Sequence, residues 1–146
     1  MTEICYDTLD QHLMLAGDLT HAVVPMGMLL GWCANMHLLS REFQQENEQA
    51  ILQVRMREVR GSELLVLGGG DLRRDMFNEA GQKFLDIYYD EYRADFGELF
   101  AAPYTVEENW DNYSSMAKVV TRKYMHSIGH KQRGPGLLGR LLWWKK

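Results

Sequence analysis

Histidines and cysteines have the most distinctive chemistry of the side chains in this sequence. His126 and His130 are four positions apart, so on a helix they would share a face and could ligate one metal ion. Gly129 lies between them, however, and neither a carboxylate nor a cysteine follows within the next turn. A frayed helix end explains this pair better than a metal site does, so we expect no metal and no other cofactor.

The sequence gives equally little support for a reactive cysteine or a phosphate-binding loop. Cys5 and Cys33 are the only cysteines and form no CxxC pair, and a reducing compartment would keep both as thiols. His21 and His37 flank the segment around Cys33, but one histidine beside one cysteine does not identify an activated nucleophile. The string LGGGDL at 67–72 lacks the Lys-Ser/Thr pair of a phosphate-binding loop. We interpret these positions as packing and turn residues.

Acidic residues are the remaining group that could do chemistry. Residues 79–111 hold nine acidic side chains against Lys83 and Arg93. Two carboxylates could act as general acid and base, but such a pair needs partial burial to separate its pKa values, and helical spacing places these acids away from the core. Two interpretations stay open: a solvated face, or a surface that binds arginines and lysines of a partner. That surface would comprise Asp86, Asp90, Asp95, Glu98, Glu107, Glu108 and Asp111.

The overall composition indicates one globular domain. The chain has 146 residues, of which 46% are hydrophobic and 25% charged, enough for a core of its own. The net charge of −4 is uneven, because five of the 16 basic residues and none of the 20 acidic ones follow His126, which leaves −9 in residues 1–125. Such a body repels nucleic acid and attracts basic protein surfaces. With no export signal and no apolar run of roughly 20 residues, we expect a cytoplasmic protein that does not enter a membrane.

Apolar residues recur at spacings of three and four along the chain, which predicts helices and no substantial sheet. We expect an all-α, single-domain bundle of about four to six helices, with a helical domain at 1–130 and a basic, apolar tail at 131–146. The expected helices are Thr20 to Leu39, Ser40 to Val59, 62–67, Asn78 to Phe100, and one after Pro103 that begins with a capping box of Thr105 and Glu108.

Three further features bear on packing. Gly27 and Gly31, four apart, would let a second helix approach the backbone of the first, with Trp32 filling the space alongside. The tail is too apolar to remain free, so it should dock on the domain, on another copy or on a partner. In the helix after Asn78, the inward side chains should be Leu85, Tyr88, Tyr89, Tyr92, Phe96 and Leu99.

Several blocks of the sequence together resemble an uncharacterised family of small helical bacterial proteins. PMGMLLGWCANMHLLSREF is similar to its signature, H-x-G-M-x-L-x-W followed by L-x-S-x-E-F. YDTLDQH resembles its opening Tyr-Asp and His, and FNEAGQKFLDIYYDEY and YTVEENWDNY resemble two later blocks. The chain departs from the pattern at Pro25, where the signature has its histidine, and at Gln11, where a tryptophan precedes His12.

Members of this family are met among the immunity proteins of polymorphic toxin systems, including type VI secretion. The resemblance therefore implies an immunity protein that binds and neutralises a cognate toxin, and it does not imply a catalytic residue. Because an immunity protein must meet its toxin where the toxin acts, the absence of an export signal leads us to expect a toxin that acts in the cytosol. A nuclease is the first candidate for that toxin, since an acidic helix face can occupy a cleft built for phosphates. Two alternatives stay open: an enzyme that reverses a toxin's modification using carboxylates or His12 and His21, and a homo-oligomeric adaptor, such as a homodimer, assembled through the tail.

Overall fold

The fold is described here for residues 5–131 of a computed structural model. This range forms eight α-helices, one 3-10 helix and a two-stranded sheet, so the all-α prediction is confirmed, with more helices than expected. Residues 132–146, which include nearly all of the predicted tail, lie outside the described residues. The elements are β1 (Cys5–Asp7), α1 (Leu9–Ala16), α2 (Leu19–Ala22), α3 (Val24–Asn35), α4 (Arg41–Glu46), α5 (Glu48–Arg55), α6 (Gly61–Leu67), β2 (Leu72–Arg73), η1 (Arg74–Met76), α7 (Glu79–Phe100) and α8 (Trp110–Lys131).

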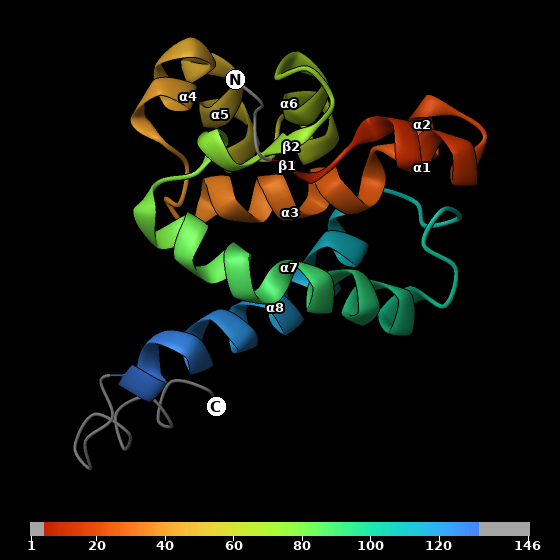
Figure 1. Cartoon of the computed structure of the whole chain (residues 1–146). Helices are drawn as coiled ribbons and strands as arrows, with labels where there is room; N and C mark the ends of the chain where they lie inside the picture. The colour runs from red at the N-terminus through yellow and green to blue at the C-terminus, as the bar shows by residue number, and fades with distance from the viewer. Residues whose placement is uncertain (1–4, 132–146) are drawn as a thin grey trace.

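Helix α3 is the centre of the molecule. It lies between α4, α5 and α6 on one side and α7 and α8 on the other (Figure 1). Every residue from Val24 to Ala34 is buried, because α3 is apolar on all sides and neighbours cover each of them. Cys33 is wholly buried, and burial raises the pKa of its thiol, which fits the packing role expected for it.

Two of the expected helices are each divided in two. The helix expected from Thr20 to Leu39 breaks at Val23, because Pro25 has no N–H and fits only in the first turn of a helix. It also ends early, at Asn35, and His37 has a left-handed backbone with φ 59° instead of lying on a helix face. The helix expected from Ser40 to Val59 breaks at Asn47, whose side-chain amide donates to the Phe43 carbonyl.

The start of α7 agrees with the sequence, since the Asn78 side chain caps it by accepting from the Gly81 N–H at 2.9 Å. Its aromatic residues are buried as expected, but Leu99 near the end is 40% exposed. The last helix begins differently from the prediction. Asn109 accepts from the Asn112 N–H at 2.8 Å, so the cap is Asn109 and the predicted capping box of Thr105 and Glu108 is wrong.

The glycine prediction is confirmed and its partner is α6. A Cβ on Gly27 would lie 2.5 Å from the Cα of Ser62, and one on Gly61 would lie 1.9 Å from the Gly27 carbonyl oxygen. Real Cβ atoms do not approach backbone so closely, so α3 and α6 meet with only hydrogens between them. Trp32 does not fill the space beside the glycines as expected: it is buried against Phe84 of α7 and Tyr124 of α8, and it donates to the Thr121 hydroxyl at 2.9 Å, which joins α3 to α8.

The small sheet ties the start of the described chain to its middle. β1 pairs with β2 in antiparallel fashion, with Cys5 opposite Arg73 and Asp7 opposite Leu72. Two short strands are not stable alone, so β1 depends on the helices behind it. Within residues 5–131, no helix is both long and apolar enough to cross a membrane.

Candidate functional site

A buried cluster of polar side chains joins three distant parts of the chain. Asp7 at the end of β1 lies 2.6 Å from Nε2 of His12 in α1, and both residues are at most 5% exposed. The Tyr104 hydroxyl lies 2.5 Å from Nδ1 of the same ring, and the Tyr89 hydroxyl of α7 donates to Asp7. Arg93 of α7 approaches the Asp7 carboxylate at 3.9 Å. Together these residues form the polar cluster.

The polar cluster holds an ionised carboxylate inside the protein. Burial alone would raise the pKa of Asp7, but the hydrogen bonds from His12 and Tyr89 and the charges of His12 and Arg93 outweigh it, so the pKa lies below its usual value. Conversely, burial and the Asp7 charge raise the pKa of Tyr89, which stays a donor. Because a carboxylate only accepts, Nε2 of His12 carries the proton and donates to Asp7.

The sequence of hydrogen-bonded groups determines which chemistry the polar cluster can carry out. The Tyr104 hydroxyl is hydrogen-bonded to Nδ1 of His12 at 2.5 Å, and Asp7 is bonded to the other nitrogen of the ring. The arrangement is a relay from tyrosine through histidine to aspartate, as in sites where a carboxylate orients a general base. It also anchors the segment between α7 and α8 to α1, which is a structural role.

Three of the seven predicted surface acids have partners within the chain. Asp86 accepts from Arg74 at 2.8 Å and from the Tyr6 hydroxyl at 2.6 Å, and these two bonds lower its pKa. Asp95 accepts from the Tyr88 hydroxyl at 2.8 Å and lies 3.3 Å from Lys123, which also pairs with Glu91. Asp95 is half-buried, so the prediction that all these acids lie away from the core is wrong for Asp95 and Glu108.

The other four predicted acids are exposed and, among residues 5–131, their carboxylates form no ion pair. They are Asp90, Glu98, Glu107 and Asp111. Asp90 and Glu98 lie on one side of α7 with Ala94 and with Ile87, which is 83% exposed. Ile87, Asp90, Ala94 and Glu98 follow one another at spacings of three and four residues, so their side chains lie on one strip of the helix. We call this strip the outer face of α7. It combines one exposed aliphatic side chain with two carboxylates that form no ion pair within residues 5–131.

Glu108 closes a contact between the segment before α8 and the start of α6. Its carboxylate accepts from the Ser62 N–H at 3.1 Å and from the Ser62 hydroxyl. Burial raises the pKa of Glu108, and the bonds from Ser62 only partly oppose this shift. Glu108 thereby binds the first turn of α6, which the tight crossing with α3 brings next to it.

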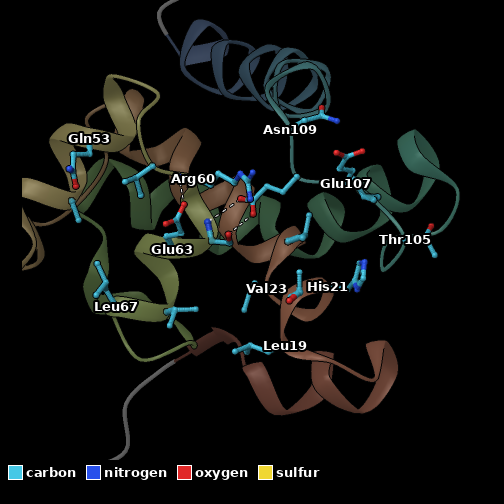
Figure 2. A pocket seen from close by; sticks show the side chains of 18 residues that line it. Leu19, His21, Val23, Gln53, Arg60, Glu63, Leu67, Thr105, Glu107 and Asn109 are labelled. Carbon is cyan, nitrogen blue, oxygen red and sulfur yellow. Dashed lines mark hydrogen bonds between the residues drawn. The ribbon is translucent and has the colours of Figure 1, made fainter.

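A cleft opens beside Glu108. It has a volume of about 790 Å³ and lies between α2, the α5–α6 region and residues 105–109. Figure 2 shows Leu19 and His21 on one side of it, Glu63 and Leu67 on α6, and Glu107 on the segment that leads to α8. Three apolar side chains at the cleft are also largely exposed, namely Leu19, Val66 and Leu67. The cleft is therefore apolar with acidic groups, and Arg60 and His21 are its basic side chains.

The raised pKa of Glu108 predicts a pH dependence of stability. A carboxyl with a higher pKa in the folded than in the unfolded chain stabilises the fold most at low pH, and this contribution is lost as the pH rises through the folded value. Glu108→Gln removes the titration but keeps an acceptor for Ser62. The difference in free energy of unfolding between variant and wild type, from urea titrations, should therefore shift in favour of the variant between pH 4 and 8. A difference that is constant with pH would contradict the raised pKa.

Among the described side chains, the other histidines, His21, His37 and His126, are not brought together. His21 is part-exposed and bonded to Asp18 at 2.9 Å, and His126 is exposed on α8. The described residues contain no group of three or more histidine, cysteine or acidic side chains placed to hold a metal. The interpretation of LGGGDL as a turn is confirmed, because Gly68 to Gly70 lead from α6 to β2.

Sequence reasoning missed the polar cluster and the cleft. Asp7, His12, Tyr89 and Tyr104 come from three of the sequence blocks described above, and each of them belongs to its block. The convergence of those blocks on one point was the available signal, but nothing in the spacing showed that Tyr104 would meet His12 over 92 positions. The cleft left no signal, because its walls come from four separate segments.

Comparison with known proteins gives a family and no function. Neither the curated proteins nor the solved structures contained a match to this chain. A family described as "Domain of unknown function (DUF7832)" matches residues 5–116, which is most of the chain and includes the polar cluster and the cleft. The chain belongs to this DUF7832 family.

Proposed function

We propose that this protein is an immunity protein, which binds a cognate toxin in the cytosol and neutralises it by occluding the toxin's active site. The observation that carries the proposal is the outer face of α7. Its two carboxylates, on Asp90 and Glu98, have no ion pair among the described residues, and Ile87 between charged neighbours is 83% exposed. Further support is the resemblance of several sequence blocks to proteins found with polymorphic toxins.

The physical basis is that the exposed groups of this face interact more favourably with a basic partner than with water. Unpaired carboxylates form charge-assisted hydrogen bonds with arginine and lysine, and they speed the encounter with a basic surface. Burying one isoleucine side chain contributes about 1.5–3 kcal/mol. A nuclease fits this chemistry, because its active site is basic and accepts phosphates, which two carboxylates can replace.

Charge reversal on α7 tests the proposal. Asp90→Lys with Glu98→Lys should weaken binding to the toxin at least tenfold, measured by calorimetry, and should lower protection in cells that express both proteins. The toxin would be the product of the neighbouring gene if that gene encodes a secretion-delivery domain. The matched control is Glu46→Lys with Glu58→Lys, two exposed acids remote in sequence from α7, which should bind as the wild type does. Unchanged affinity of the α7 variant would exclude this face.

A second candidate function, an enzyme that reverses a toxin's modification, is favoured by the Tyr104–His12–Asp7 relay. The two functions differ in stoichiometry. A binder protects only when it equals or exceeds the toxin, whereas an enzyme protects at a small fraction of that amount. Tyr104→Phe distinguishes them further, since it removes the hydroxyl of the relay but leaves the outer face of α7 intact. Full protection by this variant at equal stoichiometry favours the binder.

A further inference from the structure

The cleft between α2, α6 and residues 105–109 has a defined chemistry that the proposed function does not use. Its walls carry the apolar side chains of Leu19, Val66 and Leu67 in exposed positions. Three glutamates line it, Glu63, Glu107 and Glu108, against the guanidinium of Arg60. A segment that filled it should therefore bring both large apolar side chains and positive charge.

The chain itself contains one segment with this chemistry. Residues 137–146 read LLGRLLWWKK, with six leucine or tryptophan side chains, three basic residues and no acid. These residues lie outside the described part of the structure. Leucine and tryptophan match the apolar walls of the cleft, and arginine or lysine matches Glu107, whose carboxylate has no ion pair among the described residues.

The length of α8 limits how much of the segment can reach the cleft of its own molecule. Helix α8 begins at Trp110, next to the cleft residue Asn109, and leads away from α2 and α6 (Figure 1). Its 22 residues span about 32 Å at 1.5 Å per residue. A return over this distance from Lys131 would need about ten fully extended residues, so in its own molecule only the end of the segment, from Leu141 on, comes within reach of the cleft, and Leu137 and Leu138 do not. The segment of a second copy has no such limit.

We propose that residues 137–146 of one copy dock in the cleft of a second copy, and that two copies exchange these segments to form a symmetric dimer. Exchange of the same segment in both directions gives a closed two-fold assembly that does not extend further. Tryptophan and leucine supply the buried area, and the contact of a basic side chain with Glu107 sets the register. This inference is independent of the proposed function, because the outer face of α7 takes no part in it.

The test is the mass of the full chain, measured by light scattering over a range of concentrations. The wild type should be a dimer. Leu67→Ser in the cleft and Trp143→Ser with Trp144→Ser in the segment should each raise the dissociation constant of the dimer at least tenfold. The control is Ile87→Ser, which also removes an exposed aliphatic side chain but lies on the outer face of α7, and which should leave the dimer unchanged. Circular dichroism of each variant verifies its fold.

A charge exchange makes the test specific. Glu107→Lys should weaken the dimer by placing a lysine opposite the basic segment, and adding Lys145→Glu and Lys146→Glu to it should restore association. A wild type that is monomeric at every concentration would overturn the proposal, as would a dimer that Leu67→Ser and Glu107→Lys leave intact. Failure here would not affect the toxin-binding test, which uses other residues and another measurement.

Discussion

Replacing Gly61 by alanine is expected to destabilise the fold by about 3 kcal/mol or more, a large part of the stability of a small domain. The new Cβ would lie 1.9 Å from the Gly27 carbonyl oxygen and 3.0 Å from the Gly31 nitrogen. Both atoms are backbone, so no side chain can rotate to make room, and α3 and α6 must move apart. Urea denaturation followed by circular dichroism gives the change in the free energy of unfolding.

Gly97 is the matched control for this substitution. It lies within α7, and a Cβ added there would have no atom within 4 Å. Gly97→Ala should therefore stabilise the protein by about 0.5–1 kcal/mol, because alanine favours the helix. If both variants changed stability by the same amount, the close crossing of α3 and α6 would be contradicted.

Replacing Asp7 by alanine is the second change with a large expected effect. It leaves His12 and Tyr89 buried without the acceptor of their hydrogen bonds, and loss of one partner from a buried pair costs about 3–5 kcal/mol. The loss should depend on pH. Because the pKa of Asp7 is lowered in the folded chain, its contribution is present above the usual pKa of an aspartate and is lost as the pH falls through the folded value.

Measurement of the free energy of unfolding of both proteins from neutral to acid pH tests this prediction. The difference between wild type and Asp7→Ala should be largest near neutrality and should shrink in acid. Asp18→Asn is the control, because Asp18 also binds a histidine, His21 at 2.9 Å, but at the surface. Asparagine keeps the cap of α2, so this variant should unfold as the wild type does. An equal loss in both variants would show that burial of the Asp7 pair is irrelevant.

The sequence predicted those features that depend on near neighbours. The helix starts at Ser40 and Asn78 and the aromatic stripe of α7 follow from local spacing, and all three are present. The Gly27 and Gly31 pair predicted a close helix contact, although not that α6 would provide it. Breaks at Val23 and Asn47 were not predicted, because single residues decide them within otherwise continuous apolar patterns.

The candidate sites were harder to predict for a different reason. Helical spacing gives the face of a residue but not the partner that approaches it, so Asp86, Asp95 and Glu108 were grouped with free acids although Arg74, Lys123 and Ser62 bind them. The polar cluster needs contacts between residues 82 and 92 positions apart, which no local pattern contains. The sequence thus predicts which side chains lie at the surface better than it predicts which of them pair with one another.

The side-chain contacts that join the region of β1 to α7 and to the loop after it have a consequence for the order of folding during synthesis. Tyr6 and Asp7 leave the ribosome early, but Asp86, Tyr89 and the loop that carries Tyr104 follow about 80 or more residues later. Contacts of such long separation form late, and domains fold as their chain emerges. Tyr6 and Asp7 must therefore wait without these side-chain partners until α7 and the loop beyond it have been made, and the core residues of α8, Tyr113, Met116 and Val120, are made later still.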